Sequence, residues 1–146
     1  MIEKLSNDEA LNILNEEKVG RLACVADGYP YVVPVGYVFD NDRIYIHSLF
    51  GKKVRGLREN PRACVQVDQI ADECHWRSVV AYGTCEEITD PQEQEKVLQK
   101  LFTRFPKLTP VESSIAAGAQ PLQVIVISIR IEKITAVGEA LLPRGQ

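Results

Sequence analysis

Strand-like runs joined by very short turns are the feature that most limits how this chain can fold. Between residues 19 and 49, apolar side chains recur in runs that are interrupted only at Asp27-Gly28 and at residues 40–42. Aspartate, asparagine and glycine favour tight hairpins, because they accept the positive φ angles that short β-turns need. The sequence therefore predicts three consecutive antiparallel strands in this part of the chain.

Three more strands are predicted further along the chain. The segment that begins at Arg62 alternates over Ala63, Val65 and Val67, and alternation of this kind is typical of a half-buried strand. A longer apolar run starts at Trp76, and the last one precedes the C-terminal tail. The three later strands are expected at residues 62–70, 76–88 and 123–134.

Three short helices are predicted around the strands. Ser6 and Glu9 have the spacing of a capping box. Asp90 followed by Pro91 is the pattern of a cap residue with proline at the first helical position. A third segment carries apolar residues at helical spacing and ends at Pro61, which cannot continue a helix. The helices are expected at residues 7–17, 51–60 and 91–105.

Many strands and few short helices predict a mainly β fold with some α+β content. We expect one domain over residues 1–146, a six-stranded antiparallel barrel with short flanking helices. Within the run at residues 29–39, residues 31–39 are apolar on both faces. One face can fill the barrel, and a second subunit is the simplest cover for the other.

The charge balance argues against two classes of partner. Seventeen Lys and Arg against twenty Asp and Glu give a net charge of −3, so neither nucleic acid nor an anionic membrane surface is expected to bind. No apolar stretch approaches the roughly 18 residues of a membrane helix, and the first ten residues lack the pattern of a signal peptide. We therefore expect a cytoplasmic protein.

The four cysteines are interpreted as small buried thiols rather than as disulfides, since nothing in the sequence indicates export. They are Cys24, Cys64, Cys74 and Cys85. Cys74 stands beside His75, but two adjacent ligands without a partner set do not make a metal site. We expect no metal.

Lys52 and Lys53 open the second predicted helix, where the helix dipole is already positive and a lysine is mildly unfavourable. A phosphate would compensate, because the first-turn amides, the Ser48 hydroxyl and both ammonium groups could converge on it near Gly51. A solvated cationic face is the alternative. It is the favoured interpretation for the arginines that follow, which are Arg55, Arg58 and Arg62.

Two further residues have more than one interpretation. Pro34 removes a backbone donor from a strand, which marks an edge or a bulge. The free backbone groups nearby could bind a flat heteroaromatic ring, and a structural bulge at a barrel corner is the alternative. His47 could be a general base, a ligand contact or a core histidine. No nucleophile stands at a spacing that would make it part of a hydrolase triad, and no GxGxxG motif follows a strand. No catalytic side chain is identified.

The order of these segments can be compared with known families. They read GRLACV, DGYPYVVPVGYVF, DRIYIHS, GKKVRGLRENPRACVQVD and WRSVVAYGTCEEI, followed by a helix. This order resembles the FMN-binding split-barrel family related to pyridoxamine 5'-phosphate oxidase, especially its short bacterial members, which include nitroimidazole-resistance proteins.

The resemblance implies a homodimer of six-stranded split barrels with FMN bound at the subunit interface. It places the strand around Pro34 near the flavin ring and the Gly-Lys-Lys turn near the ribityl phosphate. The contact residues that it implies are Val33, Pro34 and Val35 for the ring, His47, Ser48, Lys52 and Lys53 for the phosphate side, and Trp76, Arg77 and Ser78 as further contacts.

The expected function is an FMN-dependent oxidoreductase that acts on an unidentified small molecule, with NADH or NADPH as a candidate electron donor. The arginine- and histidine-containing segment with which pyridoxamine phosphate oxidases hold their substrate has no counterpart in residues 136–146. Oxidation of vitamin B6 is therefore not expected. The alternatives are a flavin-binding sensor or carrier without turnover, and a haem-binding or haem-degrading relative with His75 as a ligand.

Overall fold

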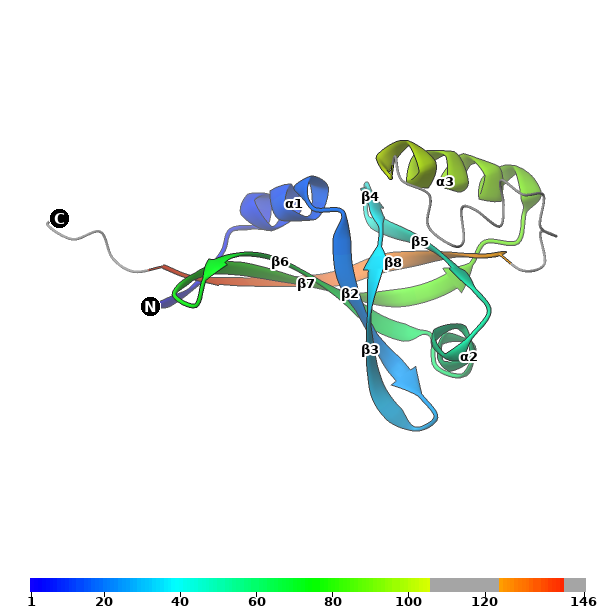
Figure 1. The fold of residues 1–146 in the computed structure, drawn as a ribbon, viewed down its shortest axis with the longest axis horizontal. Helices are drawn as coiled ribbons and strands as arrows, with labels where there is room; N and C mark the ends of the chain where they lie inside the picture. The colour runs from blue at the N-terminus through cyan, green and yellow to red at the C-terminus, as the bar shows by residue number, and fades with distance from the viewer. Residues whose placement is uncertain (106–123, 141–146) are drawn as a thin grey trace, which may run out of the picture.

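A computed structural model describes residues 1–105 and 124–140, and Figure 1 shows their arrangement. Three helices and eight strands lie within these residues. In chain order they are β1 (Ile2–Lys4), α1 (Asn7–Glu16), β2 (Val19–Ala26), β3 (Tyr29–Gly36), β4 (Val38–Asp40), β5 (Arg43–Leu49), α2 (Lys52–Glu59), β6 (Arg62–Asp72), β7 (His75–Glu87), α3 (Pro91–Arg104) and β8 (Val124–Glu139).

All strands belong to one antiparallel sheet with the order β3-β2-β6-β7-β8-β5-β4, and β1 pairs with β8 beside this path. The two ends of the path, β3 and β4, are consecutive in the chain and separated only by Tyr37. The chain itself therefore joins the ends of the sheet into a barrel. The Tyr37 side chain is fully buried, and its hydroxyl donates to the Leu14 carbonyl at 2.7 Å, which ties this junction to α1.

The predicted fold class, a mainly β antiparallel split barrel, is confirmed, but the predicted number of six strands is wrong. The run expected as one strand at residues 29–39 is divided at Tyr37 into β3 and β4. The other additional strand, β1, consists of three exposed residues that pair with Val137–Glu139. Such a segment has no apolar alternation from which it could be predicted.

The inner face of the barrel forms the main apolar core. Leu22, Ile44, Val65 and Ile129 are fully buried there, and the first three are flanked along their strands by more exposed neighbours. A second, smaller cluster lies under α3, which packs against β4, β5 and β8. In Figure 1, α1 and α3 lie above the sheet, and α2 lies below it beside the β2–β3 hairpin.

The caps predicted for α1 and α3 are present. The Glu9 amide donates to Ser6 Oγ at 3.2 Å, and the Ser6 amide donates to Glu9 Oε2 at 2.8 Å. At the start of α3, Asp90 accepts from the Glu93 amide at 3.0 Å and Pro91 is the first helical residue. Both helices therefore begin at the residues that the local sequence predicts.

The predicted hairpin turn at residues 27–28 is also confirmed, since Asp27 and Gly28 have φ angles of 54° and 76°. Asn41, with φ of 59°, makes the turn between β4 and β5. The predicted loop at residues 107–121 and the tail beyond residue 140 lie outside the described residues. Within the described ranges, no helix is long and apolar enough to cross a bilayer.

All four cysteines are free. Cys24 is buried, and Cys64, Cys74 and Cys85 are partly buried. Burial raises the pKa of Cys85 to about 12, so that thiol stays protonated at neutral pH. No group of three potential metal ligands comes together among residues 1–105 and 124–140.

Candidate functional site

The N-terminal turn of α2 lacks the usual groups that satisfy a helix start. Gly51 is its cap residue, in an extended conformation, and it offers no side-chain hydrogen bond. The first turn contains no acidic residue, and instead begins with Lys52 and Lys53. First-turn amides without a side-chain cap, a positive dipole end and two ammonium groups together favour an anion.

The two lysines extend from this turn toward the β2–β3 hairpin. Lys52 Nζ lies 5.0 Å from the centroid of the Tyr31 ring, and Tyr31 is opposite Cys24 in the register of β2 and β3. Lys53 is half-buried near Cys24. Burial lowers the pKa of the Lys53 ammonium, and a nearby negative charge would oppose this shift. A bound phosphate would provide such a charge.

Gly56 sets how closely α2 approaches β2. A Cβ atom at this position would lie 2.5 Å from the Val25 carbonyl oxygen, which is too close for any side chain. On either side of Gly56, Val54 and Leu57 are buried against the core. The glycine therefore fixes where the N-terminal turn of α2, with its two lysines, stands relative to β2.

The arginines on α2 were expected to face solvent. Arg55 and Arg58 are both exposed, as expected, and Arg58 also forms an ion pair with Glu87 and lies 5.2 Å from the centroid of the Phe50 ring. Arg58 is therefore engaged with β7 rather than directed at the start of the helix. The cationic groups at the start of α2 are Lys52 and Lys53.

His47 and Ser48 occupy opposite faces of β5. Ser48 is 4% exposed and donates to the Leu49 carbonyl at 2.6 Å. The His47 ring meets Phe102 of α3 edge to face, with the ring centroids 6.3 Å apart. The two side chains do not converge on one point, although they are neighbours in the sequence.

Pro34 lies on β3, an edge strand, in regular register opposite Arg21 of β2. β3 is the end of the sheet path, so within the described part of the chain one edge of its backbone has no strand partner. Pro34 is exposed, Val33 is half-buried and Val35 is buried. The two valines thus belong to the barrel face, and Pro34 belongs to the outer face.

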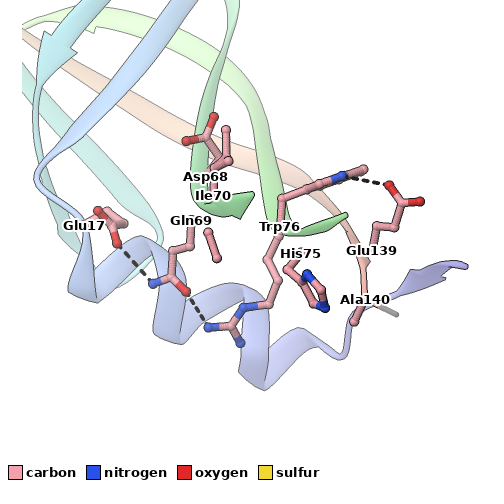
Figure 2. Close-up of a pocket in the computed structure, with 10 residues that line it drawn as sticks. Glu17, Asp68, Gln69, Ile70, His75, Trp76, Glu139 and Ala140 are labelled. Atoms are coloured by element: carbon pink, nitrogen blue, oxygen red, sulfur yellow. Dashed lines mark hydrogen bonds between the residues drawn. The ribbon is translucent and has the colours of Figure 1, made fainter. Parts of the chain in front are cut away.

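Trp76 and Arg77 line a pocket of about 670 Å³ near the C-terminal end of α1, between the ends of β6, β7 and β8 (Figure 2). Trp76 Nε1 donates to Glu139 Oε2 at 2.9 Å. Arg77 donates to the Gln69 side chain, whose amide in turn donates to Glu17 Oε1 at 3.1 Å. The pocket thus combines an indole with several carboxylates, and its one arginine is already hydrogen-bonded.

His75 lies on the wall of the same pocket. Its Nδ1 atom is 2.9 Å from Asp72 Oδ1, and the hydrogen bond from His75 holds the pKa of the Asp72 carboxyl below its usual value. Because Asp72 occupies one ring nitrogen, only Nε2 could bind a metal or haem iron.

The predicted contact residues fall into two groups within the chain. Lys52 and Lys53 lie by the Cys24 end of β2. Ser78 pairs with Asp68 of β6, whereas β2 pairs with β6 through Arg21 opposite Gln66, closer to the start of β2. The segment Trp76–Ser78 is therefore displaced from the lysines both along the strands and across the sheet.

A polar network beside Ser78 was missed by sequence analysis. Arg21 Nη1 donates a hydrogen bond to Asp68 Oδ2. Gln66 Nε2 donates to Asp68 Oδ2 and to Ser78 Oγ, and each of the three bonds is 2.9 Å long. These residues stand at alternate positions of otherwise apolar strands. That alternation of polar residues was the available signal, but it does not reveal which strands are neighbours.

The network lies within an exposed apolar face made by the outer sides of β2, β3, β7 and β8. Val19 is 58% exposed and Val32 is 60% exposed, and Val25, Tyr82 and Val137 are each more than a third exposed. An apolar face of this kind around a fixed polar cluster is typical of an interaction surface.

The sequence pattern of the pyridoxamine 5'-phosphate oxidase family matches residues 6–136. An uncharacterised protein of Rhizobium meliloti is 33% identical over 88 residues, which are 60% of this chain. The match spans only 58% of that relative's length.

Solved structures share the fold. A FAD-binding protein of Mesorhizobium loti is 30% identical with a TM-score of 0.78, over 96% of this chain and 99% of the other. A Bacteroides thetaiotaomicron protein, whose description links it to 5-nitroimidazole antibiotic resistance, has 18% identity and a TM-score of 0.73, over 94% and 89%. A FAD and haem binding protein of Mycobacterium smegmatis has 21% identity and a TM-score of 0.71, over 97% and 75%.

Proposed function

The chain belongs to the pyridoxamine 5'-phosphate oxidase family, and from this premise we propose that it is a flavoprotein that binds FMN and oxidises or reduces a small molecule. The start of α2 is the observation that carries this proposal. It combines two lysines, no acidic residue and no side-chain cap, which is an arrangement suited to a phosphate group.

In this proposal each group of site residues has a separate task. Lys52, Lys53 and the first-turn amides of α2 hold the phosphate, and His47 and Ser48 lie on the strand that leads into this turn. The flavin supplies the redox chemistry, and the protein orients it and excludes water. The segments that would hold the ring are Val33–Val35 of one protomer and Trp76–Ser78 of a second.

We assign the second segment to another protomer because the two segments are far apart within one chain. Pro34 on β3 and Ser78 on β7 are separated by three steps across the sheet, about 14 Å at the usual strand spacing. The exposed apolar face around Val19 and Val32 would be buried in a two-fold dimer. The proposal therefore includes a homodimer with flavin at its interface.

A comparison of FMN, FAD and riboflavin tests the cofactor. The Mesorhizobium loti relative is FAD-binding, so FAD is the first competitor to FMN. The purified protein is denatured, the released flavin is identified by chromatography, and the stripped protein is titrated with all three compounds. We expect FMN to bind well and riboflavin much more weakly. Equal affinity for riboflavin and FMN would contradict the phosphate site. Absence of any flavin binding would contradict the proposed function.

Turnover is tested separately. The flavin-loaded protein is mixed with NADH or NADPH without oxygen, and loss of the flavin absorption is followed by addition of a nitroaromatic compound or a quinone. We expect reduction by one donor and reoxidation by an acceptor. If no donor reduces the bound flavin, the protein is a carrier or sensor rather than an oxidoreductase. We also propose that the protein is cytoplasmic.

Haem binding is the second candidate function. The FAD and haem binding protein of Mycobacterium smegmatis shares this fold, and His75 lines the large pocket with one ring nitrogen held by Asp72. Titration with haem would give a Soret band that is absent in His75→Ala. A band of equal strength in the variant would exclude His75 as the ligand, and no band in the wild type would exclude haem.

A further inference from the structure

Four polar side chains form one connected network on the outer face of β2, β6 and β7. Arg21 Nη1 donates to Gln66 Oε1 at 3.2 Å and to Asp68 Oδ2 at 2.9 Å. Gln66 Nε2 donates to Asp68 Oδ2 and to Ser78 Oγ, both at 2.9 Å. The network therefore begins on an exposed arginine and ends on the Ser78 hydroxyl.

The partners of Gln66 fix the orientation of its amide. A guanidinium group can only donate and a carboxylate can only accept, so Oε1 must face Arg21 and Nε2 must face Asp68. In the flipped amide, donor would meet donor at Arg21, and acceptor would meet acceptor at Asp68. Gln66 consequently presents a hydrogen, and not a lone pair, to Ser78.

This orientation determines what Ser78 can offer to a partner. A hydroxyl group has a single hydrogen, and Ser78 Oγ already accepts from Gln66. Among residues 1–105 and 124–140, no acceptor takes the hydrogen of Ser78. The half-buried hydroxyl therefore presents a hydrogen-bond donor to whatever covers the outer face.

We propose that Gln66 is a positioning residue that makes Ser78 a hydrogen-bond donor to an acceptor atom of the bound flavin. This inference rests on the proposed function. Reduced flavin carries negative charge that oxidised flavin lacks, and a hydrogen bond to a charged acceptor is roughly twice as strong as one to a neutral acceptor. The Ser78 donor therefore stabilises reduced flavin and raises its reduction potential. Arg21 and Asp68 act through Gln66.

The decisive variant exchanges the amide and the carboxylate of the network. In Gln66→Glu with Asp68→Asn, the net charge and the shapes of both side chains are kept. Glu at position 66 accepts from Arg21 and from the new Asn, and it has no hydrogen for Ser78. The Ser78 hydroxyl must then donate inward, so that it offers a lone pair to the flavin instead of a hydrogen.

The measurement is the midpoint potential of bound FMN, titrated against reference dyes. We expect the double variant to bind reduced FMN up to tenfold more weakly relative to oxidised FMN, a fall of up to about 30 mV for a two-electron couple. Ser78→Ala should lower the potential in the same direction, and Ser78→Thr, which keeps the hydroxyl, should restore it. This pair tests the contact even if the double variant fails to fold.

A matched control exchanges the same two groups elsewhere. Gln99→Glu with Glu95→Gln makes the exchange on the exposed surface of α3 and should leave the potential unchanged. If FMN binds and the double variant and Ser78→Ala both keep the wild-type potential, the inference is wrong and the proposed function stands. If the wild-type protein binds no flavin, both are wrong.

Discussion

The first turn of α2 differs from the first turns of α1 and α3 both in charge and in how its amides are satisfied. Helix α1 begins with a capping box and carries Asp8 and Glu9, and α3 begins with Asp90 and carries Glu93. Helix α2 has a glycine cap, no acidic residue and two lysines. The favourable arrangement at a helix start is therefore reversed at only one of the three described helices.

This difference separates the caps of α1 and α3, which stabilise the fold, from the first turn of α2, which is suited to an anion. The caps of α1 and α3 satisfy their own amides, so those helices are complete without a partner. At α2 the lysines add positive charge to a positive dipole end, which costs stability unless an anion binds. The residues of this turn should therefore affect flavin affinity more than stability, and the caps of α1 and α3 should do the opposite.

The largest expected effect is on FMN affinity in Lys53→Ala. Loss of a charged hydrogen bond to phosphate should cost about 1.5 to 3 kcal/mol of binding free energy, on the order of tenfold to a hundredfold in Kd. Fluorescence titration with FMN measures it, with Lys96→Ala on the exposed surface of α3 as the control. An unchanged Kd would show that Lys53 does not contact the phosphate and would contradict the distinction between α2 and the other helices.

The next effect tests how α2 is held in place. Gly56→Ala would set a Cβ atom against the Val25 carbonyl, so we expect a loss of about 1 to 3 kcal/mol in unfolding free energy despite the better helix propensity of alanine. FMN affinity should fall as well, because the turn that carries Lys52 and Lys53 is displaced. Urea unfolding that shows Gly56→Ala to be as stable as the wild type would contradict the contact.

Ser6→Ala tests whether the cap of α1 affects stability and not flavin affinity. Removal of this cap should lower the unfolding free energy by about 1 kcal/mol, because the Glu9 amide loses its acceptor. The FMN Kd should not change. A weaker Kd in this variant would show that the start of α1 also contributes to the ligand site.

The smallest effect is expected from giving α2 an ordinary cap. Gly51→Asp has room for its side chain and should add about 0.5 to 1 kcal/mol of stability through the cap and the dipole. It should also weaken FMN binding, because the carboxylate competes with phosphate for the same amides. Gly51→Asn supplies the cap without the charge, so its FMN affinity should lie between those of Gly51→Asp and the wild type. Tighter FMN binding by Gly51→Asp would contradict a phosphate at this turn.

Local signals explain which parts of the fold could be predicted. The capping box at Ser6, the proline after Asp90 and the turn at Asp27 involve neighbouring residues only, and all are confirmed. The break at Tyr37 could not be predicted, because it depends on a hydrogen bond to Leu14, 23 residues away. Strand β1 could not be predicted either, since only its pairing with β8 makes it a strand.

The residues of the candidate site also differ in whether they could be predicted from the sequence. Lys52 and Lys53 could be found from the sequence because their charge conflicts with the helix that they begin, a conflict visible within a few residues. The network from Arg21 to Asp68 spans 47 residues and depends on β2 lying beside β6. Likewise, the placement of His47 and Ser48 on opposite faces follows from the strand, although their adjacency in sequence suggested a shared role.

Strand β8 also determines the order in which this fold can be completed during synthesis. It pairs with β1, β5 and β7, so three earlier strands depend on a strand that is synthesised after all of them. The hairpins β2–β3 and β6–β7 can form as soon as they leave the ribosome. Strand β1 can pair only after β8, the last described strand, has been synthesised. Until β8 arrives, β5 and β7 present open edges, and an incomplete chain of this kind is prone to associate with other chains.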